Sequence, residues 1–598
     1  MNMNGGKLKN AALPAIALVL AVFSVYYAAL GFGFVYDDSE LILGNRWILS
    51  FSSIPEVFST HTFGFKDAGY QAISYRPMLF LIYMAEYAAF GLEAWGWHLV
   101  NLIMHSVNSV LVFLILRHLL EAENKGYSST LPAFAGALIF SVHPTNAESV
   151  SWLATMAELT FTFLCLAAFY LEARSIDGKS RGVIERAASR MAPALFFLAA
   201  LLLKETAVVL PVIVFAYDGA RKGFWGSFSR AGVPRYLPYI AAAFVYAGMR
   251  AVALEGEMTP TEKLHAFLSP YEFGLNAVVL LARYFRALVL PVGEPPLQLM
   301  DPVLSLSEPR AVLSLFAAVA APLVLAIALR RITRLWALIL AILILPILPT
   351  LYSIAVSRFP YADRYLYFPT VGLAMLIAVV LARLRARPGQ WGRLAVIAVL
   401  AAALPFALLA RQKSAAWESD RTLWGAALAA QSGNYVAVHS IAVEYFREGR
   451  HDEAAALFED SLNANLSTEH PDQSMVLLTR KVLPQAYIKA GLEAKAEVSL
   501  EEYLKLVPDD APSLYNLAFI KHRKGACHDA VELYQLAAVF SKDAALSART
   551  HYNMGECYRS LGMSDEALRS FREALRYAPG DSLILDRIGA LEGPRPGP

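Results

Sequence analysis

Two adjacent carboxylates, Asp37 and Asp38, directly follow the first long apolar run of the sequence. At the exit of a membrane span, such a pair could hold a general base near a membrane-borne substrate, because repulsion between the two charges raises the pKa of one of them. An ordinary acidic loop would contain the same residues. Taken alone, the pair favours that simpler interpretation.

Four polar residues, His98, Asn101, His105 and Asn108, interrupt a second apolar run at spacings of three, four and three. This spacing places all four side chains on one face of a helix. A polar face within a membrane span points toward water or other polar groups, since an ionisable group in lipid costs about 2.5–3.5 kcal/mol. The stripe could line a cavity, and hydrogen bonding between helices explains any single member equally well.

Further ionisable residues lie where apolar runs end. His143 precedes a proline, which favours a helix end at that point, and Glu148 follows shortly after. Lys204 and Glu205 separate two short apolar runs. Lys204 could bind a phosphate, or it could pair with Glu205 or another carboxylate, and His143 could be only a capping residue.

Basic residues also occur in a loop whose surroundings are acidic. Arg358 and the pair Asp363-Arg364 precede a long apolar run, and Arg76 lies at the start of the segment 75–91. A lipid phosphate held at the membrane surface would account for arginines there, and ion pairs with nearby acidic loops are the alternative. All these candidates except the inner members of the stripe are predicted on one membrane face, and this convergence favours a catalytic site.

The elements that must position these residues are membrane spans. Hydrophobic residues make up 57% of the 598 residues and charged residues 17%, and apolar runs of bilayer-spanning length recur up to about residue 411. Several runs are short, which predicts helices that end inside a cavity lined by protein. The sequence predicts eleven spans, at 11–32, 96–116, 130–143, 150–172, 191–203, 205–219, 236–254, 311–329, 335–351, 366–383 and 393–411.

The distribution of Lys and Arg predicts the orientation of these spans. Basic residues gather in alternate loops, around 117–125, 174–190, 221–235, 330–334 and 383–393, and acidic residues dominate the opposite loops. This pattern places the N-terminus in the cytoplasm. After eleven crossings, the C-terminal tail lies on the other side.

Three segments need separate interpretation. A single crossing at 272–291 would invert the charge pattern after it, so a hairpin or an interfacial helix is predicted there. The segment 75–91 starts close to a proline and carries aromatic residues, which predicts a helix on the outer membrane surface. The first apolar run, 11–32, is longer than the roughly 7–15 residues of a signal-peptide core, which favours an uncleaved span.

After a predicted linker at 412–434, a helical pattern with a period near 34 residues covers residues 435–598. Stacked helix pairs of this kind form a concave surface that commonly binds peptides or proteins, and a spacer or an oligomer contact is the alternative. Cys527 and Cys557 lie in neighbouring units and could form a disulfide or remain free thiols. The clearest unit places Gly555, Tyr558, Ala567, Phe571, Ala574 and Pro579 at the small, aromatic and proline positions of the tetratricopeptide repeat.

Taken together, these patterns resemble the TMTC-type tetratricopeptide membrane proteins, a group of GT-C-class glycosyltransferases, and the chain looks like a bacterial-style member. The matching stretches occur in the family's order, from the first span to the last repeat. They are FVYDDSELILGN (34–45), YRPMLFLIY (75–83), FGLEAWGWHLVNLIMHSVNSVLVFLIL (90–116), FSVHPTNAESVSWLA (140–154), KETAVVLP (204–211) and DRYLYFPTVG (363–372).

The resemblance implies an all-α fold, with a GT-C-like polytopic membrane helix bundle at 1–411 and a tetratricopeptide α-solenoid at 435–598. It also implies a sugar donor linked to a polyprenyl phosphate, and an acceptor hydroxyl on Ser or Thr of a protein or on an envelope glycan. An aspartate in the first outer loop acts as base in such enzymes and corresponds to Asp37 or Asp38. The outer-loop arginine that binds the lipid phosphate corresponds to Arg364.

Two positions depart from the family pattern. Where relatives tend to have a glycine-arginine pair, this chain has Ala154-Thr155-Met156-Ala157, which affects the predicted contacts to the sugar or the acceptor. Asp363 stands where relatives usually have Glu.

We therefore predict an inverting transfer in which Asp38, with Asp37 close by, takes the acceptor's proton. Cations stabilise the departing phosphate, so no metal or other cofactor is expected. The predicted phosphate-binding residues are Arg364, Lys204 and Arg358, and the other predicted cavity residues are Arg76, His98, Asn101, His105, His143, Glu148, Glu205 and Asp363.

The alternative is a catalytically inactive membrane scaffold that recruits envelope proteins through its repeats. A transporter is less well supported, because the polar groups gather on one face instead of marking a path across the bilayer. The expected location is a bacterial inner membrane, with the N-terminus in the cytoplasm and the repeats in the periplasm. Polyprenyl-phosphate lipid and a protein partner are expected, and nucleic acid is not.

Overall fold

The computed structural model describes residues 3–66, 74–123, 129–177, 183–223, 233–255, 264–386 and 389–592, with the side chains of 3–10 and 183–189 left undescribed. Parts of the loops used to predict the orientation, around 117–125, 174–190, 221–235 and 383–393, therefore lie outside the described residues. The described residues form helices and no strand, which confirms the predicted all-α fold. The chain divides into two compact units, Met1–Gln431 and Ser432–Pro598.

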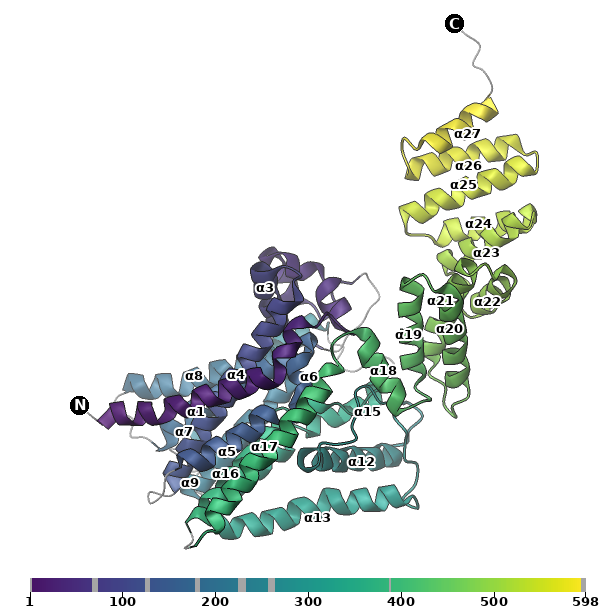
Figure 1. Cartoon of the computed structure of the whole chain (residues 1–598). Helices are drawn as coiled ribbons and strands as arrows, with labels where there is room; N and C mark the ends of the chain where they lie inside the picture. Colours follow the sequence, from purple (N-terminus) through teal and green to yellow (C-terminus); the bar gives the residue numbers. More distant parts are fainter. Residues whose placement is uncertain are drawn as a thin grey trace. The chain divides into compact units, whose positions relative to one another are not determined.

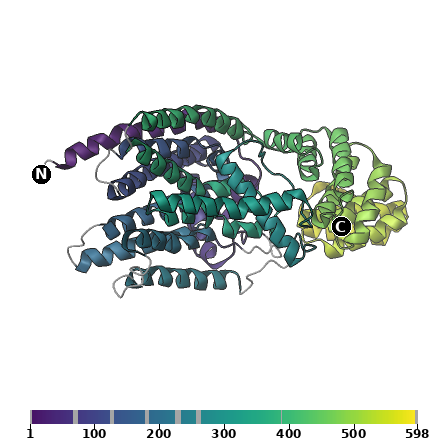
Figure 2. The ribbon, with the colours of Figure 1, turned by 90° about the horizontal axis from the view of Figure 1, so that it is seen from below.

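The first unit is a bundle in which most of the long helices run in one general direction (Figures 1 and 2). Its helices are α1 (Met3–Tyr26), α2 (Ile54–Ser59), α3 (Pro77–Phe90), α4 (Ala94–Glu123), α5 (Thr130–Val142), α6 (Asn146–Ser151), α7 (Met156–Asp177), α8 (Val183–Leu201), α9 (Leu210–Lys222), α11 (Leu237–Ala253), α12 (Pro270–Val289), α13 (Pro309–Ile332), α14 (Trp336–Ile344), α15 (Ser353–Val356), α16 (Pro369–Arg385), α17 (Trp391–Ala415) and α18 (Asp420–Ala430).

Seven helical segments among the described residues are long and apolar enough to cross a membrane. Three shorter apolar helices, including α3 and α5, accompany them. The lengths and compositions support a multi-pass membrane protein, whereas the predicted number of eleven crossings and their direction stay predictions. The seven segments are Ala11–Gly31, Ala94–Glu123, Leu153–Asp177, Val233–Ala253, Pro309–Ile332, Trp336–Val356 and Trp391–Ala415.

Close backbone packing holds the centre of this bundle together. Gly136 of α5 lies against α16, and a Cβ atom at this position would collide with the carbonyl oxygen of Ala374. Gly372 of α16 lies close to Leu343 of α14, where an added Cβ would meet the side chain at 2.8 Å. Small residues permit such contacts in membranes, where association depends on close packing. The two glycines therefore fix α5, α16 and α14 side by side.

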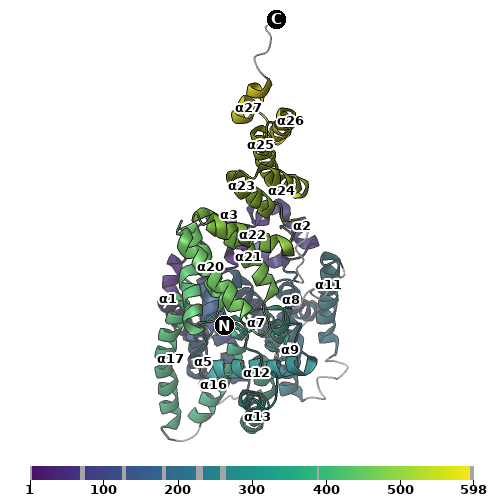
Figure 3. The same cartoon turned by 90° about the vertical axis from the view of Figure 1, so that its right-hand side faces the viewer.

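The segment 272–291, for which the sequence predicted a hairpin or an interfacial helix, forms helix α12. It is a single continuous helix whose Ser269 and Glu272 form a capping box, so the hairpin interpretation is wrong. The buried residues Asn276, Leu280 and Tyr284 follow at four-residue intervals and give the helix one packed face. Figure 3 looks along α13 and shows α12 running across it, an orientation compatible with an interfacial helix.

The predicted linker at 412–434 is largely helical. Helix α17 continues to Ala415, and α18 follows within the first unit. The reason is a set of buried apolar residues at helical spacing, which includes Leu423, Trp424 and Ala427. The sequence interpretation overlooked this short amphipathic pattern because it lies beyond the last long apolar run.

The second unit is a stack of antiparallel helix pairs. Glycines with positive φ, from 76° to 81°, end the first helix of four pairs, at Gly449, Gly491, Gly525 and Gly562. This left-handed conformation is a common helix ending that glycine adopts without strain. The helices are α19 (Tyr435–Arg447), α20 (His451–Leu466), α21 (Gln473–Lys489), α22 (Glu493–Leu506), α23 (Ala511–Arg523), α24 (Cys527–Phe540), α25 (Ala544–Ser560), α26 (Ser564–Tyr577) and α27 (Ser582–Glu592).

Four of the residues that identified the clearest repeat unit, Gly555, Ala567, Phe571 and Ala574, are buried within these pairs, whereas Pro579 is exposed. Ala567 and Phe571 are fully buried, and Gly555 leaves room for the ring of Phe571. Cys527 and Cys557 are buried free thiols, which excludes the disulfide alternative in this structure. Small residues where helices approach and aromatic residues between them thus build the core of each pair.

Candidate active site

Three short segments meet at one end of the helix bundle and build the candidate site. They are the loop after α1, the turn between α5 and α7 that contains α6, and the loop 357–368 before α16. Helix α5 ends at Val142 because Pro144 forces His143 into an extended conformation, with ψ of 128°. The chain then turns through α6, whose residues are all buried.

The loop after α1 presents the two aspartates in different directions. Tyr36, just before them, has a φ of 55°, which is unusual for a residue other than glycine and marks a sharp turn. The Tyr36 ring packs against Trp152 and Trp424, with ring centroids 5.6 and 5.5 Å away. Its backbone N–H donates to the Asp420 carboxylate over 2.8 Å. These contacts stabilise the turn and so set the positions of both carboxylates.

Asp38 is fully buried and both of its carboxylate oxygens are engaged. Oδ2 accepts a hydrogen bond from the backbone N–H of Val35 at 3.0 Å, and Oδ1 accepts one from Ala154 at 2.8 Å. The second bond joins the loop after α1 to the segment that follows α6. Burial raises the pKa of Asp38 well above its ordinary value, although the two N–H donors oppose the shift. Asp38 therefore connects two segments of the site.

Asp37 is only partly buried, and no hydrogen-bond partner for its carboxylate occurs in the described part of the chain. Burial raises the pKa of Asp37 to about 6, while Arg364 and Lys66 act in the opposite direction and Glu40 adds to the increase. Such a carboxylate is mostly ionised at neutral pH and remains basic enough to accept a proton. Of the two aspartates, Asp37 is the one available to a ligand.

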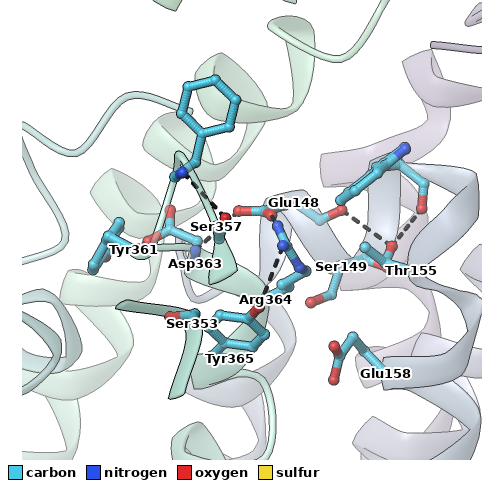
Figure 4. A network of polar contacts seen from close by, with 12 residues as sticks. Glu148, Ser149, Thr155, Glu158, Ser353, Ser357, Tyr361, Asp363, Arg364 and Tyr365 are labelled. Atoms are coloured by element: carbon cyan, nitrogen blue, oxygen red, sulfur yellow. Dashed lines mark hydrogen bonds and ion pairs between the residues drawn. The ribbon is translucent and has the colours of Figure 1, made fainter. Parts of the chain in front are cut away.

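Arg364 lies between an acidic partner and aromatic rings, as Figure 4 shows. Its Nη1 donates to the Glu148 carboxylate at 2.5 Å, and its guanidinium lies 5.1 Å from the ring centre of Trp152 and 4.8 Å from that of Tyr365. The other oxygen of Glu148 accepts the backbone N–H of Asp363 at 2.9 Å. Glu148 thus fixes both the loop and the direction of the arginine side chain.

Asp363 has a separate partner. Its carboxylate accepts hydrogen bonds from Lys413 of α17 and from the Tyr361 hydroxyl, each at 2.6 Å. Lys413 was absent from the predicted site. It follows the last apolar run, where a single lysine carries no recognisable signal.

Two more acid–base pairs extend this polar surface. Lys204 is nearly buried, pairs with Glu158, and lies 4.9 Å from the ring centre of Tyr365. Of the partners open to Lys204, the structure therefore selects a carboxylate other than Glu205. Glu205 instead accepts from Arg76 at 3.5 Å and from Arg250 at 3.1 Å.

Glu158 connects these pairs electrostatically, since its charge acts on both Arg76 and Arg364. The sequence interpretation missed Glu158 because residues 150–172 were treated as one apolar run. A carboxylate inside such a run is costly and should have indicated a buried partner. Tyr365, the ring shared by Arg364 and Lys204, lies in the motif DRYLYFPTVG, but an aromatic residue in this motif does not by itself indicate a site residue.

The polar stripe of α4 has a structural role in this arrangement. His105 contacts the Tyr367 hydroxyl at 2.8 Å and the Ser141 carbonyl at 3.0 Å. Asn101 donates to the carbonyls of Val150 and Trp152, and Asn108 to that of Leu159 and to Tyr367. These hydrogen bonds attach α4 to α5 and to the turn around α6. The stripe therefore forms hydrogen bonds between helices, which is the second of the two roles predicted for it.

The remaining predicted residues lie around the site without entering its centre. His98 is fully buried, and its ring centre lies 6.0 Å from that of Phe32. His143 contacts Thr145 at 2.7 Å and the Leu288 carbonyl of α12 at 3.1 Å. Arg358 accepts a backbone hydrogen bond from Met300 and lies within electrostatic range of Tyr36.

A cavity of about 410 Å³ opens beside the Arg364–Glu148 pair. Its polar walls include Glu148, Asp363, Arg364 and Lys413, and Trp417 contributes an aromatic surface. Concave sites of this size and mixed lining are typical of small-ligand binding. A ligand in this cavity would reach one side of the Arg364 guanidinium.

Comparison with known proteins confirms the predicted resemblance. The tetratricopeptide repeat profile matches residues 509–579. Protein O-mannosyl-transferase Tmtc1 of Drosophila melanogaster is 33% identical over 188 residues, which cover 31% of this chain and 20% of that protein. Protein O-mannosyl-transferase Tmtc3 of the same organism is 22% identical over 629 residues, which cover 92% of this chain and 66% of that protein.

A nematode relative extends the comparison. Protein O-mannosyl-transferase F38B6.6 of Caenorhabditis elegans is 22% identical over 378 residues, which cover 61% of this chain and 51% of that protein. Each of these matches spans less than two thirds of the relative's length. Among solved structures, the repeat protein YrrB aligns with a TM-score of 0.24 and 19% identity, over 32% of this chain and 85% of that one.

Proposed function

We propose that this chain is a membrane glycosyltransferase that transfers a sugar from a polyprenyl-phosphate donor to a hydroxyl group of a protein. The observation that carries the proposal is the Asp37 carboxylate, which has no hydrogen-bond partner among the described residues and lies within electrostatic range of Arg364. A base and a phosphate-binding cation are the two groups that such a transfer needs. The names of the relatives, which are protein O-mannosyl-transferases, support the same reaction class.

Asp37 is the proposed general base. Its carboxylate takes the proton of the acceptor hydroxyl while the hydroxyl oxygen forms a bond to the anomeric carbon. The bond between that carbon and the phosphate oxygen breaks on the opposite face, and its electron pair leaves with the lipid phosphate. The product then has the inverted anomeric configuration. Asp38, whose two oxygens are already engaged by backbone N–H groups, supports the loop instead of accepting the proton.

Arg364 is the proposed ligand of the departing phosphate. A guanidinium group carries five N–H donors, and Glu148 engages Nη1. Nη2 makes only a long contact of 3.5 Å with Tyr365, so donors remain for a phosphate. The charge that develops on the phosphate is stabilised by a cation already fixed in direction, which is the most effective form of electrostatic catalysis.

Lys204 and Arg76 are proposed to raise the positive potential around the phosphate without direct contact in the resting state. Each is paired with a carboxylate, Glu158 or Glu205. Because cations neutralise the leaving group in this proposal, the transfer needs no metal. Arg364 is the proposed phosphate ligand in preference to Arg358, because the charge of Arg364 acts on the Asp37 carboxylate.

The experiment that tests this function is transfer from a labelled polyprenyl-phosphate mannose to peptides by the full chain in nanodiscs. Asp37→Asn should lower kcat by at least about 100-fold, the usual size of a general-base contribution. Glu56→Gln, the same chemical change at an exposed carboxylate of the same loop region, should leave the rate unchanged. Transfer that survives Asp37→Asn would remove the proposed base.

A second candidate function is a catalytically inactive scaffold. It is favoured by the ion pairs that already neutralise Arg364 and Lys204. If no polyprenyl-phosphate sugar gives product, while the full chain binds peptides with wild-type affinity after Asp37→Asn, the scaffold function replaces the transferase.

A further inference from the structure

A second cavity, of about 1130 Å³, lies between α4, α9, α13, α14 and α16. It is distinct from the candidate active site and shares none of its lining residues. The C-terminal ends of α4, α9, α13 and α16 contribute Glu123, Arg221, Arg331 and Arg383. The N-terminal part of α14 contributes Trp336 and a series of apolar residues.

This cavity lies at the end of the bundle opposite to the candidate active site. Helix α16 begins just after Arg364 and Tyr367 and reaches the cavity at Arg383, about 20 Å farther along at 1.5 Å per residue. Helix α4 likewise carries His98 near the site and Glu123 at the cavity. Figure 1 shows α9 at the opposite end of the first unit from α6 and α15. The two cavities therefore lie at opposite ends of the bundle.

One wall of the cavity is apolar and accessible from the lipid. Val212 and Phe215 of α9 and Leu340 and Ile344 of α14 line this wall. Val212 is 52% exposed although it lies in an apolar helix. In a membrane, such exposure means contact with acyl chains. The wall is thus suited to a hydrocarbon chain that lies along α9 and α14.

The rim of the cavity is strongly basic. Arg221, Arg330, Arg331, Arg334 and Arg383 line it, and Glu123 is the one acidic residue among the described lining residues. Two of the arginines are neutralised locally, since Arg221 pairs with Asp177 at 2.7 Å and Arg383 with Glu123 at 2.9 Å.

The other three rim arginines are not neutralised in this way. Arg330, Arg331 and Arg334 are exposed and have no ion pair within the described parts of the chain. Three uncompensated guanidinium groups at the mouth of an apolar cavity are complementary to an anionic headgroup above an acyl chain.

We infer that this cavity binds an anionic glycerophospholipid of the leaflet opposite to the candidate active site. The headgroup phosphate contacts Arg330, Arg331 and Arg334, and an acyl chain lies along the apolar wall between α9 and α14. A soluble phosphate would leave the apolar wall unused. The proposed donor lipid is needed at the other end of the bundle, beside Arg364. This inference does not depend on the proposed function.

The test uses the fluorescence of Trp336, which lines the cavity and is 38% exposed. The full chain is placed in phosphatidylcholine nanodiscs that contain equal mole fractions of either brominated phosphatidylglycerol or brominated phosphatidylcholine. Bromine quenches tryptophan at short range, and subtraction of a Trp336→Phe sample isolates this residue from the other eight tryptophans. The anionic lipid should be enriched beside Trp336, roughly fivefold for each arginine that binds it.

The controls separate a site from general attraction to a basic surface. Arg331→Gln together with Arg334→Gln should abolish the preference for the brominated anionic lipid. Arg174→Gln together with Arg393→Gln removes the same charge from exposed positions at the same end of the bundle, outside the cavity, and should leave the preference intact. Equal quenching by the two lipids in the wild type overturns the inference. So does an equal loss of preference in both double variants.

Discussion

Neighbouring residues of the same type have different environments in this protein. Asp38 accepts two backbone hydrogen bonds and is fully buried, whereas Asp37 is partly accessible and lies within electrostatic range of Arg364. The sequence predicted that one of the pair acts as base and favoured Asp38. It could not distinguish them, because the difference depends on the positive φ of Tyr36 and on an N–H group 116 residues away.

The pH dependence of transfer should follow Asp37. Because burial raises its pKa to about 6, the carboxylate is lost as the pH falls through that value. The logarithm of kcat/KM should therefore be level above pH 7 and fall with a slope of about one below pH 6. A pH–rate profile measured with the acceptor well below its KM, where the rate is proportional to kcat/KM, tests this. A rate that stays constant down to pH 5 would contradict the assignment of Asp37.

Asp38 should contribute mainly to stability. Asp38→Ala leaves the N–H groups of Val35 and Ala154 without an acceptor in a buried environment, which should cost about 2–4 kcal/mol. Thermal unfolding of the purified chain in detergent measures the loss. Asp37→Ala is the matched control and should change the unfolding temperature little, since the Asp37 carboxylate has no hydrogen-bond partner in the described residues and the backbone carbonyl that accepts from Glu40 and Leu41 stays in place. Equal effects of both substitutions would refute the distinction.

Helices with a strong periodic sequence pattern could be predicted from the sequence. Helices whose conformation depends on contacts with distant residues could not. The long apolar runs and the repeat helices were recognised from spacing alone. Helix α12 remained ambiguous, since its apolar content suits a hairpin or an interfacial helix equally. Helix α18 was missed, because its single buried face is recognisable only against the partners that cover it, Tyr36 and Phe359.

The contact between α5 and α16 should tolerate no added methyl group at its centre. In Gly136→Ala the new Cβ collides with the Ala374 carbonyl oxygen, which belongs to the backbone and cannot move aside. We expect a destabilisation of about 1–3 kcal/mol, the typical cost of overpacking. Gly248→Ala, in α11, is the control, because a Cβ there meets nothing within 4 Å. Both unfolding temperatures can be measured in the same detergent.

The proposed function requires a particular membrane topology of the whole first unit. The candidate active site and the basic cavity lie at opposite ends of the bundle, since α4 and α16 each run from one to the other. The sequence predicted this separation from the distribution of charge. The membrane face of each end stays a prediction.

Labelling with a membrane-impermeant maleimide tests that topology in intact bacterial cells. The three native cysteines are buried, so the background should be low. Ser52→Cys, in the loop region after α1, and Lys542→Cys, in the repeats, are both exposed and should react. Arg331→Cys, at the basic cavity, should react only after the membrane is permeabilised. Reaction of Arg331→Cys in intact cells would reverse the proposed orientation.

Helix α18 has a practical consequence for dissecting the protein. A truncation after the last apolar run, near residue 411, would delete Asp420 and Trp424 and leave the Tyr36 turn without its hydrogen-bond acceptor and one of its aromatic neighbours. The stacked pair of Trp152 and Trp417, with ring centres 4.9 Å apart, would also be lost. A fragment that retains the residues through Gln431 preserves all these contacts. An inactive fragment cut at the shorter boundary would therefore give no information about whether the repeats participate in turnover.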